Sequence, residues 1–360
     1  MHSISLPTYD VLVKHGGLAG VADIARAATR ASRYAVITDS NVVRVHGERV
    51  VTALGSVGTR TFTVPAGEAS KTRETWARLT DELLEAGFGR DSAIVAVGGG
   101  VVGDLAGFVA ATFMRGIKYV QVPTSLIAMI DASVGGKTGV DTPRGKNLVG
   151  AFHQPAAVLA DPAVLGTLPP EHFRSGLAEA LKHGIIADGM YLERTIADTP
   201  MLLDAAARRA DATEALVARS IEIKAEIVRR DEREQGLRQV LNFGHTIGHA
   251  IEAASDYTLL HGDCVAVGMV YEATMAVKMG VAGPGTARDV RRAVERVGLP
   301  TALPPNVSID RLIALIRADK KVRSGALRFA LPREIGAMAS GDGTWSVPVD
   351  ESIVRGVLAA

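Results

Sequence analysis

Three histidines fall in one short stretch of the chain, and a glutamate further upstream completes a set suited to metal chemistry. His245 and His249 are four residues apart, so they share one face if the stretch is helical. His261 follows, and Glu179 lies in an earlier segment with helical periodicity. Two histidines and one glutamate form a catalytic zinc set that leaves a coordination position open for substrate. Spacing alone leaves open which histidine binds metal and which transfers protons.

Residues in this stretch and elsewhere in the chain also allow interpretations without metal chemistry. Thr246 stands where the zinc-protease motif HExxH has its glutamate, so that motif is absent. Lys182 lies three residues after Glu179, a spacing that also describes an ordinary solvent-exposed helix pair. Lys320 and Lys321 could likewise form an exposed charge run, and Cys264 is typical of a packing residue.

A glycine-rich turn is the second candidate for chemistry. The segment Gly98–Gly103 has the pattern G-x-G-x-x-G between an apolar run and a helix-like segment. Such a turn lets the backbone approach a pyrophosphate and directs helix N–H groups at it. A tight strand-to-helix turn without a ligand is the alternative. No acidic residue follows about 20 positions on, where many dinucleotide-binding domains hold the ribose. Asp39 is the candidate for that contact, or else a turn or helix N-cap residue.

The surrounding periodicity predicts the elements that position these residues. Strands are expected at 34–38, 92–97 and 119–122, with a helix over 71–86, and this alternation favours a parallel sheet with covering helices. From Pro170 onward the pattern is mostly helical, with helices expected at 173–183, 212–230, 240–254, 264–279 and 287–297. A domain boundary is expected near 165–170.

Composition limits the class of protein. A chain of 360 residues fits two domains. The formal net charge of +1 argues against a general binder of nucleic acid or anionic membranes. The single cysteine cannot form a disulfide within the chain. Neither a signal-peptide core nor a long apolar run is seen, so the expected location is the cytoplasm.

Several long segments resemble the signature sequences of the 3-dehydroquinate synthase family. They are ASVGGKTGVDTPRGKNLVGAFHQP (132–155), GLAEALKHGII (176–186), KAEIVRRDEREQGLRQVLNFGHTIGHAIE (224–252), LHGDCVAVGM (260–269) and DKKVRSG (319–325). The resemblance implies a Rossmann-like α/β NAD-binding domain at 1–167 and a mainly helical metal- and substrate-binding domain at 168–360. It also implies an active site in the cleft between them.

The resemblance further implies a reaction and its cofactors. The substrate would be 3-deoxy-D-arabino-heptulosonate 7-phosphate, and the products 3-dehydroquinate and phosphate, in the second step of the shikimate pathway. The reaction would use catalytic NAD and a divalent metal, zinc or cobalt. A homodimer is implied, in which the position matching Arg115 reaches the partner's active site.

Site roles follow from the resemblance position by position. The metal ligands would be Glu179, His245 and His261, and the catalytic residues His249, Lys182 and Asp131. Substrate contacts would come from Arg115, Lys137, Asn147, Lys224, Arg238, Asn242 and one of Lys320 and Lys321. NAD contacts would come from Asp39, Asn41, Glu68, Lys71, Gly99, Gly100, Asp104, Thr124, Ser125, Lys146 and Thr167.

The basic residues suit this substrate. A planar guanidinium such as that of Arg238 grips a carboxylate with two hydrogen bonds. Lys224 and Arg238 match the family's carboxylate-binding pair, and two buried cations are costly unless an anion joins them. Letters common in the family differ at Met129, Ala132 and His183, none of which has an assigned role.

Related enzymes are the competing interpretations. Aminodehydroquinate synthase is nearly indistinguishable by sequence, whereas 2-deoxy-scyllo-inosose synthase and valiolone-type synthases use substrates without a carboxylate. Lys224, Arg238, Asn242 and His249 together favour the dehydroquinate type. A metal-dependent polyol dehydrogenase would consume NAD stoichiometrically. An NAD-sensing module without enzymatic activity would need the glycine turn but not the metal and anion-binding residues.

Overall fold

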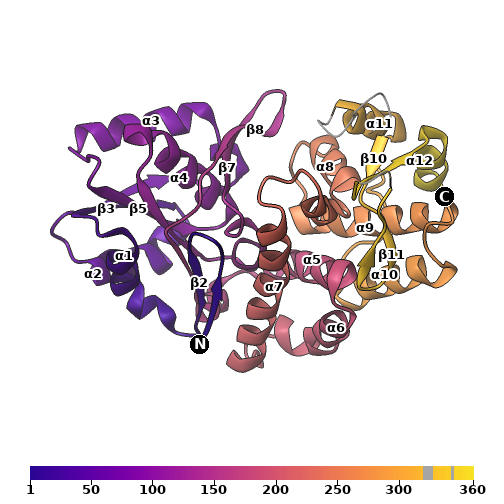
Figure 1. The fold of residues 1–360 in the computed structure, drawn as a ribbon, viewed down its shortest axis with the longest axis horizontal. Helices are drawn as coiled ribbons and strands as arrows, with labels where there is room; N and C mark the ends of the chain where they lie inside the picture. The colour runs from indigo at the N-terminus through magenta and orange to yellow at the C-terminus, as the bar shows by residue number, and fades with distance from the viewer. Residues whose placement is uncertain (319–326, 342–343) are drawn as a thin grey trace. The chain divides into compact units, whose positions relative to one another are not determined.

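The apolar runs of the first half of the chain form a seven-stranded sheet with the order β1-β2-β9-β6-β5-β3-β4 (Figure 1). β1 pairs antiparallel with β2, whereas the other neighbouring pairs are parallel. The strands are β1 His2–Ser5, β2 Asp10–Val13, β3 Arg33–Asp39, β4 Thr59–Val64, β5 Ser92–Gly98, β6 Lys118–Pro123 and β9 Ala157–Ala160. All residues of β5 are buried, as its unbroken apolar run predicts for a central strand covered on both faces.

The computed structural model describes residues 1–318, 327–341 and 344–360. The chain forms two compact units. The first unit contains Met1–Pro169 and Arg209–Ala225, and the second unit contains Pro170–Arg208 and Glu226–Ala360. Each unit is built around its own set of buried apolar residues. Within the described ranges, no helix combines the length and apolar character needed to cross a membrane.

Helices cover both faces of the sheet in the first unit. They are α1 Val21–Thr29, α2 Glu48–Leu54, α3 Arg73–Glu85 and α4 Gly100–Thr112. Figure 1 shows α1 and α2 on the opposite face from α3 and α4. Leu79 of α3 and Leu105 of α4 pack with Ile37 and Ile94 of the central strands, all without exposed surface. The hairpin of β7 Lys137–Thr142 and β8 Gly145–Phe152 packs against α4.

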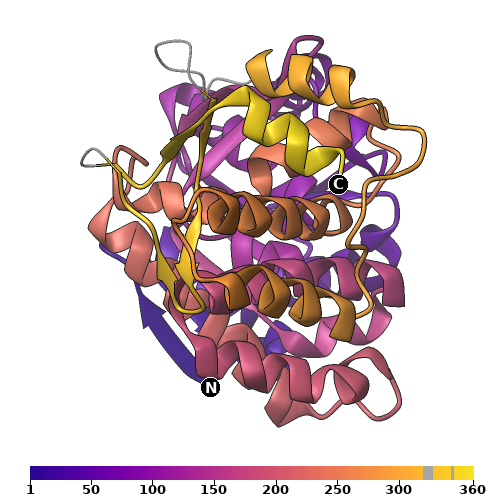
Figure 2. The same cartoon turned by 90° about the vertical axis from the view of Figure 1, so that its right-hand side faces the viewer.

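The second unit is mainly helical. Its helices are α5 Pro170–Ala187, α6 Gly189–Leu203, α8 His245–Ala254, α9 His261–Lys278, α10 Pro284–Arg296, α11 Ile309–Ala318 and α12 Glu351–Leu358, while α7 Ala210–Arg230 belongs partly to each unit. α9 packs against α5, α8, α10 and α12, and Figure 2 shows α9 and α10 side by side. The short strands β10 Leu327–Phe329 and β13 Val347–Val349 form one pair, and β11 Pro332–Glu334 and β12 Ala337–Met338 form another.

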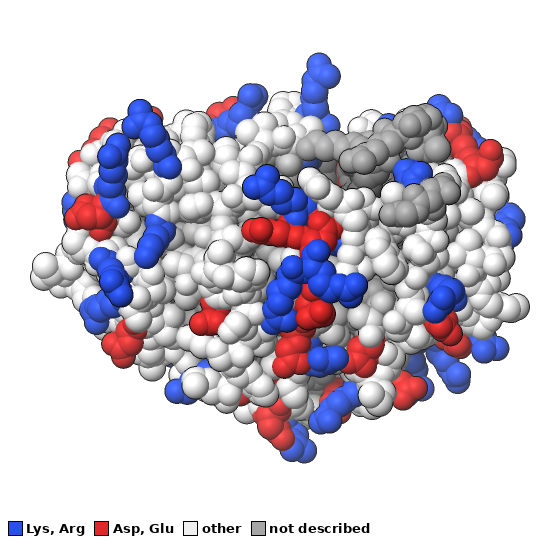
Figure 3. All heavy atoms as spheres, in the orientation of Figure 1, with Lys and Arg blue, Asp and Glu red and all other residues white. Residues whose placement is uncertain are grey.

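Turns of 3-10 or π type connect these elements. They span Gly17–Gly20, Val43–Gly47, Glu68–Ser70, Phe113–Arg115, Ala128–Ala132, Pro162–Thr167 and Leu237–Asn242. On the face drawn in Figure 3, acidic and basic side chains are interspersed over the surface. This mixture agrees with the near-zero net charge of the sequence.

The predicted strands and helices are confirmed in type, and several helix boundaries differ from the predicted ones by three to five residues. The largest difference has a clear physical reason. The helix predicted over 240–254 begins at His245. Gly244 has a φ of 80°, a left-handed conformation that separates this helix from the turn at Leu237–Asn242. Several elements were not predicted, among them the antiparallel strand β1, the edge strand β4 and the helices α1, α2, α6, α11 and α12. The expected α/β first half and mainly helical second half are confirmed.

Candidate metal and nucleotide sites

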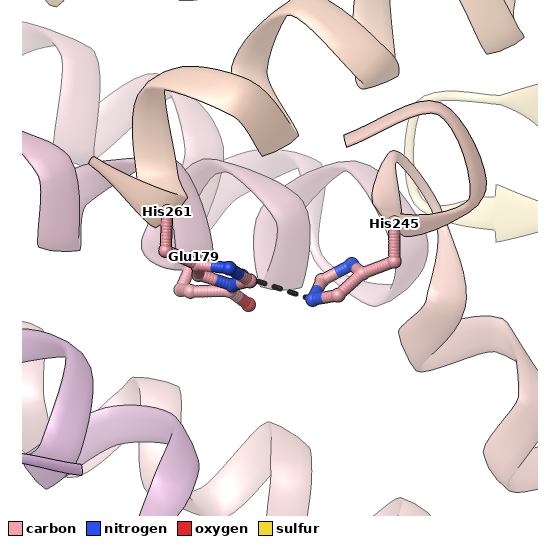
Figure 4. Close-up of side chains that lie close together, drawn as sticks. All are labelled: Glu179, His245 and His261. Atoms are coloured by element: carbon pink, nitrogen blue, oxygen red, sulfur yellow. Dashed lines mark ion pairs between the residues drawn. The ribbon is translucent and has the colours of Figure 1, made fainter. Parts of the chain in front are cut away.

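Three helices of the second unit bring Glu179, His245 and His261 together (Figure 4). Glu179 lies within α5 and has no exposed surface, while the two histidines are the first residues of α8 and α9. The Oε1 atom of Glu179 lies 3.4 Å from Nε2 of His245 and 3.5 Å from Nε2 of His261. Helix starts thus direct both imidazoles at one buried carboxylate.

Hydrogen bonds on the far side of each ring decide which nitrogen faces this carboxylate. Nδ1 of His245 lies 3.1 Å from the carbonyl oxygen of Phe243, and Nδ1 of His261 lies 3.1 Å from Oε1 of Glu252. Both partners are acceptors, so Nδ1 carries the hydrogen in each ring. In the neutral rings, both Nε2 lone pairs then face an oxygen of Glu179. Three electron-pair donors at this separation repel one another unless a proton or a cation lies among them.

The two distances from the Glu179 oxygen to the histidine nitrogens fit a metal ion. Tetrahedral zinc with ligand bonds of about 2.0–2.1 Å places its ligand atoms about 3.3–3.4 Å apart. The separations of 3.4 and 3.5 Å match that edge length closely. The donor set of two imidazoles and one carboxylate suits zinc or another divalent transition metal. The cluster therefore passes both a geometric and a chemical test for a metal site.

Protonation is the metal-free alternative at the same position. Desolvation lowers the pKa of His261, but the negative charge of Glu252 and hydrogen bonds to Glu179 and Glu252 outweigh it and raise the pKa to about 10. A proton therefore stabilises the metal-free cluster at neutral pH. A metal ion that binds here must displace that proton.

Lys182 and His249 lie beside the cluster. The Lys182 ammonium forms an ion pair with Oε2 of Glu179, and its side chain is only 1% exposed, which excludes the solvent-exposed helix pair considered from the sequence. The His249 ring centroid lies 5.2 Å from that of His245 and 5.9 Å from that of His261. The second unit thus holds an ammonium and a third imidazole within reach of the candidate metal position.

Two buried glutamates near this cluster were not singled out from the sequence. Glu252 accepts from His261, as described above. Glu272 accepts hydrogen bonds from the backbone N–H groups of Gly244 (2.6 Å) and Ile247 (3.2 Å), and so holds the start of α8 against α9. For Glu252 a signal existed, because it lies seven residues after His245 and three after His249 on one helical face.

The first unit places the glycine-rich turn at a topological switch point. The chain passes from β3 to the edge strand β4, then returns to form β5 on the other side of β3. Open α/β sheets bind ligands at the carboxyl ends of such a strand pair. Asp39 ends β3 and Gly98 ends β5 there. A Cβ on Gly98 would lie 2.6 Å from Cβ of Val102, so glycine permits the close approach of β5 and α4.

The start of α4 has the properties of an anion site. Gly99 is its N-cap and makes no side-chain cap hydrogen bond, and no acidic residue occupies the first turn. The neighbouring residues are small or polar: Gly100 lies in that first turn, Thr124 donates its N–H to the carbonyl of Gly98 at 2.9 Å, and the Ser125 hydroxyl faces Gly99. These features suit a pyrophosphate.

Charged residues predicted to contact NAD form one connected group. The buried Lys71 pairs with Asp104 at 2.6 Å and with Glu68 at 3.8 Å, and Lys146 pairs with Glu68 at 3.4 Å. Desolvation lowers the pKa of Lys71, but Asp104, Glu68 and Asp141 together raise it above its usual range. Lys71 is therefore a permanent cation with carboxylates on several sides.

Asp39 has the turn role that the sequence offered as an alternative. Its Oδ1 accepts from the backbone N–H groups of Asn41 (2.8 Å) and Val42 (2.9 Å). The hydroxyl of Thr167 is 2.8 Å from Nε2 of His46, in the turn Val43–Gly47 that follows β3. Asp39 therefore has a structural role in this turn, and its contact with a ribose stays a prediction.

Predicted substrate residues also pair within the first unit. Nζ of Lys224 on α7 donates to Oδ1 of Asp131 at 2.7 Å and to its carbonyl at 2.6 Å. Asn147 has a φ of 56° in the β7–β8 hairpin, where its N–H donates to Asp141, and Lys137 begins β7. Lys224 thus already has an anionic partner, which the sequence argument about two uncompensated cations did not foresee.

Family models match the chain in two consecutive parts. The model described as 3-dehydroquinate synthase N-terminal covers residues 61–175, and the model described as 3-dehydroquinate synthase C-terminal covers residues 176–322. The 3-dehydroquinate synthase of Symbiobacterium thermophilum is 47% identical over 90% of this chain and 91% of its own. That of Gloeobacter violaceus is 42% identical over 99% of this chain and 97% of its own. The chain belongs to the 3-dehydroquinate synthase family.

Solved structures of related cyclases have the same fold. A 2-deoxy-scyllo-inosose synthase complexed with carbaglucose-6-phosphate, NAD+ and Co2+ is 26% identical, has a TM-score of 0.91 and covers 99% of both chains. A 2-epi-5-epi-valiolone synthase from Streptomyces hygroscopicus with NAD+ and Zn2+ bound is 28% identical, has a TM-score of 0.87 and covers 100% of this chain and 98% of its own. The fold class predicted from the family resemblance is confirmed.

The remaining residues matched to the 3-dehydroquinate synthase family lie on turns. Arg238 and Asn242 belong to the turn before α8; Arg238 is 2% exposed and donates to the carbonyl of Glu232, and Asn242 donates to Glu234. Arg115 has a φ of 69° in the turn Phe113–Arg115 that follows α4. Lys320 and Lys321 lie outside the described residues.

Proposed function

We propose that this chain is a 3-dehydroquinate synthase. It converts 3-deoxy-D-arabino-heptulosonate 7-phosphate to 3-dehydroquinate and phosphate with catalytic NAD and a divalent metal. The observation that carries the proposal is the convergence of Glu179, His245 and His261 at metal-ligand spacing, in a chain similar to named 3-dehydroquinate synthases over nearly its whole length.

The metal would be held by Glu179, His245 and His261. When bound, it supplies a Lewis acid that polarises the substrate hydroxyl to be oxidised. A set of three protein ligands would leave room for a substrate oxygen. Lys182, paired with Glu179, holds positive charge next to that position. His249 lies beside two of the ligands and is suited to transfer a proton near neutral pH.

NAD would be held by the first unit, with its pyrophosphate at the start of α4. When bound there, NAD would supply the hydride acceptor and donor for a reaction that leaves it unchanged overall. The proposed contacts are Asp39, Asn41, Glu68, Lys71, Gly99, Gly100, Asp104, Thr124, Ser125, Lys146 and Thr167. In this proposal residues 1–167 form the NAD-binding domain, and residues 168–360 form the metal- and substrate-binding domain.

The substrate's two anionic ends require cations. Arg238 is proposed for the carboxylate, since a guanidinium fork matches two carboxylate oxygens. Lys224 would assist it while Asp131 shares the lysine's charge. Lys137 and Asn147 would bind the middle of the substrate. Further contacts proposed for its phosphate end are Arg115, Asn242 and one of Lys320 and Lys321.

Phosphate release from the heptulosonate phosphate tests the reaction. With a trace of NAD, the purified chain should release many equivalents of phosphate per NAD and accumulate no NADH. Absorbance at the NADH band and a colorimetric phosphate assay provide the two readouts. Accumulation of one NADH per product would contradict the proposal and indicate a polyol dehydrogenase.

A 2-deoxy-scyllo-inosose synthase is the second candidate, because a solved structure of that enzyme is so similar in fold. Its substrate class lacks the carboxylate that Arg238 is proposed to bind. Glucose 6-phosphate should therefore be turned over very poorly. Comparable rates on glucose 6-phosphate and the heptulosonate phosphate would overturn the carboxylate assignment.

Variants of Arg238 sharpen the comparison. A hydrogen bond to a charged group contributes about 1.5–3 kcal/mol, so Arg238→Ala should lower kcat/KM for the heptulosonate phosphate by about 10- to 150-fold. Arg238→Lys should remain impaired because the planar fork is lost. Arg233→Ala, at an exposed arginine of the same segment, is the matched control and should leave kcat/KM unchanged. Unchanged kcat/KM in Arg238→Ala would contradict the assignment.

The proposal includes a homodimer that acts in the cytoplasm. The proposal of shared sites rests on the family resemblance, in which the position matching Arg115 reaches the partner's active site.

A further inference from the structure

Glu252 is a buried acidic residue to which the proposed reaction assigns no role. It lies on α8, is 2% exposed, and its Oε1 is 3.1 Å from Nδ1 of His261. A buried carboxylate is costly unless it is paired or hydrogen-bonded. Its partner here is the imidazole of a candidate metal ligand, which suggests a role tied to that ligand.

His261 lies between two carboxylates that approach opposite ring nitrogens. Nδ1 faces Glu252 at 3.1 Å, and Nε2 faces Oε1 of Glu179 at 3.5 Å. Donation of Nδ1–H to Glu252 directs the Nε2 lone pair toward Glu179 and His245. Without this acceptor, the ring of a 29% exposed side chain at a helix start has other tautomers and rotamers available.

His245 is supported differently. Its Nδ1 contacts the carbonyl of Phe243, two residues earlier in the chain, so a neutral backbone group fixes its tautomer. The acceptor at His261 is instead a charged side chain from a neighbouring helix. A carboxylate partner also increases the basicity of the ligating nitrogen. The two ligands can therefore be separated by mutation, because only one depends on a side chain.

We propose that Glu252 is a positioning residue of the metal site, which rests on the metal role proposed above. It holds His261 in the Nδ1–H tautomer, orients the ring, and strengthens Nε2 as a ligand. In carboxylate–histidine–metal arrangements of this type, loss of the carboxylate commonly weakens metal affinity about 10- to 100-fold.

The rival interpretation makes Glu252 a ligand itself. His249, Glu252 and His261 also have potential ligand atoms within 4.8 Å of one another. The Nδ1–Oε1 separation of 3.1 Å is a hydrogen-bond length, and Nε2 of the same ring remains directed at Glu179. The geometry thus favours one metal ion supported by Glu252 over a second ion bound by it.

Metal affinity of the full chain is the decisive measurement. The variants Glu252→Ala and Glu252→Gln are compared with wild type by competition of Zn2+ and Co2+ with a chromophoric chelator. We expect Glu252→Ala to weaken affinity about 10- to 100-fold. Glu252→Gln keeps an acceptor of the same size but loses the charge, so its loss should be smaller. The visible spectrum of bound Co2+ should shift in both variants, and excess metal should restore activity.

Thr246→Val is the matched control. Thr246 is a buried residue of the same helix whose hydroxyl has no hydrogen-bond partner among the described residues, so the near-isosteric valine should leave metal affinity unchanged. If Glu252→Ala fails to fold, Glu252→Gln carries the test. Wild-type affinity and Co2+ spectrum in a Glu252 variant of lowered melting temperature would show a purely structural role and overturn the proposal.

Stoichiometry separates the remaining outcomes. One equivalent of metal in wild type and in Glu252→Gln at saturation is the expected result. Two equivalents in wild type and one in Glu252→Ala would overturn the positioning role in favour of a ligand role. A wild-type chain that binds neither Zn2+ nor Co2+ would overturn the proposed metal site itself, and this inference with it.

Discussion

At the scale of single residues, the orientation of His245 and His261 toward Glu179 depends on the hydrogen-bond acceptor at each Nδ1 atom. Phe243 and Glu252 accept hydrogens from the Nδ1 atoms of the two histidines, which directs both Nε2 atoms at one carboxylate. A catalytic group held in this way needs little reorganisation when a ligand arrives.

His245→Ala should abolish metal binding and activity together, because the site then keeps only one histidine and one carboxylate of its three ligands. Elemental analysis of the purified variant provides the measurement. His172→Ala, at an exposed histidine of α5, is the control and should retain one metal per chain. Stoichiometric metal in His245→Ala would rule out the proposed ligand set.

Metal affinity should rise with pH. His261 has a pKa raised to about 10 in the metal-free chain, so it is protonated at neutral pH and must lose that proton when metal binds. We expect log affinity to increase by about one unit per pH unit between about pH 7 and 9, with release of about one proton per metal. Calorimetry in buffers of different ionisation enthalpy measures the proton count. An affinity independent of pH would contradict this assignment.

At the scale of elements, the contact between α8 and α9 positions both histidines. A Cβ on Gly268 of α9 would lie 2.0 Å from the carbonyl oxygen of Gly244, and one on Gly248 would lie 3.1 Å from Cα of Val265. These glycines let the two helix backbones approach closely. Glu272 then fixes the start of α8 through the N–H of Gly244.

Gly244→Ala should disturb this contact and release metal. The residue has a φ of +80°, and its Cβ would lie 2.6 Å from Cγ of Met269 and 2.7 Å from the carbonyl oxygen of Val265. The left-handed backbone alone costs about 1–2 kcal/mol for alanine, and the contact with backbone adds to it. Urea denaturation and metal content are the measurements.

Gly280→Ala is the matched control for Gly244→Ala. Gly280 has a φ of +69°, and nothing lies within 4 Å of its Cβ position. It should therefore lose only the backbone contribution to the free energy of unfolding and keep its metal. Equal destabilisation in the two variants would mean that close helix packing does not matter at Gly244.

At the scale of the whole molecule, the proposed homodimer with shared active sites predicts complementation. Arg115→Ala and His249→Ala chains should each be inactive alone. If Arg115 acts in the partner's site, each mixed dimer keeps one intact site, so random 1:1 exchange should restore about a quarter of wild-type activity. Co-refolded mixtures and each variant refolded alone are assayed for phosphate release. A fully active monomer by analytical ultracentrifugation would contradict shared sites.

Local sequence patterns were sufficient for much of the architecture. The unbroken apolar run of β5 predicts a central buried strand, and helical spacing places His245 and His249 on one face. Both depend on residues that are neighbours in sequence. The family motifs supplied the candidate residues and the reaction, which composition and spacing alone could not provide.

The tertiary structure decided the relations between distant residues. Glu252 becomes the partner of His261 only because α8 and α9 pack together, and Lys224 becomes the partner of Asp131 through a contact 93 positions apart in sequence. The order of the strands, which puts Asp39 and Gly98 at one switch point, also depends on pairing between separate segments. Long-range packing determines which side chains meet, whereas periodicity reports only on which face of its own element a side chain lies.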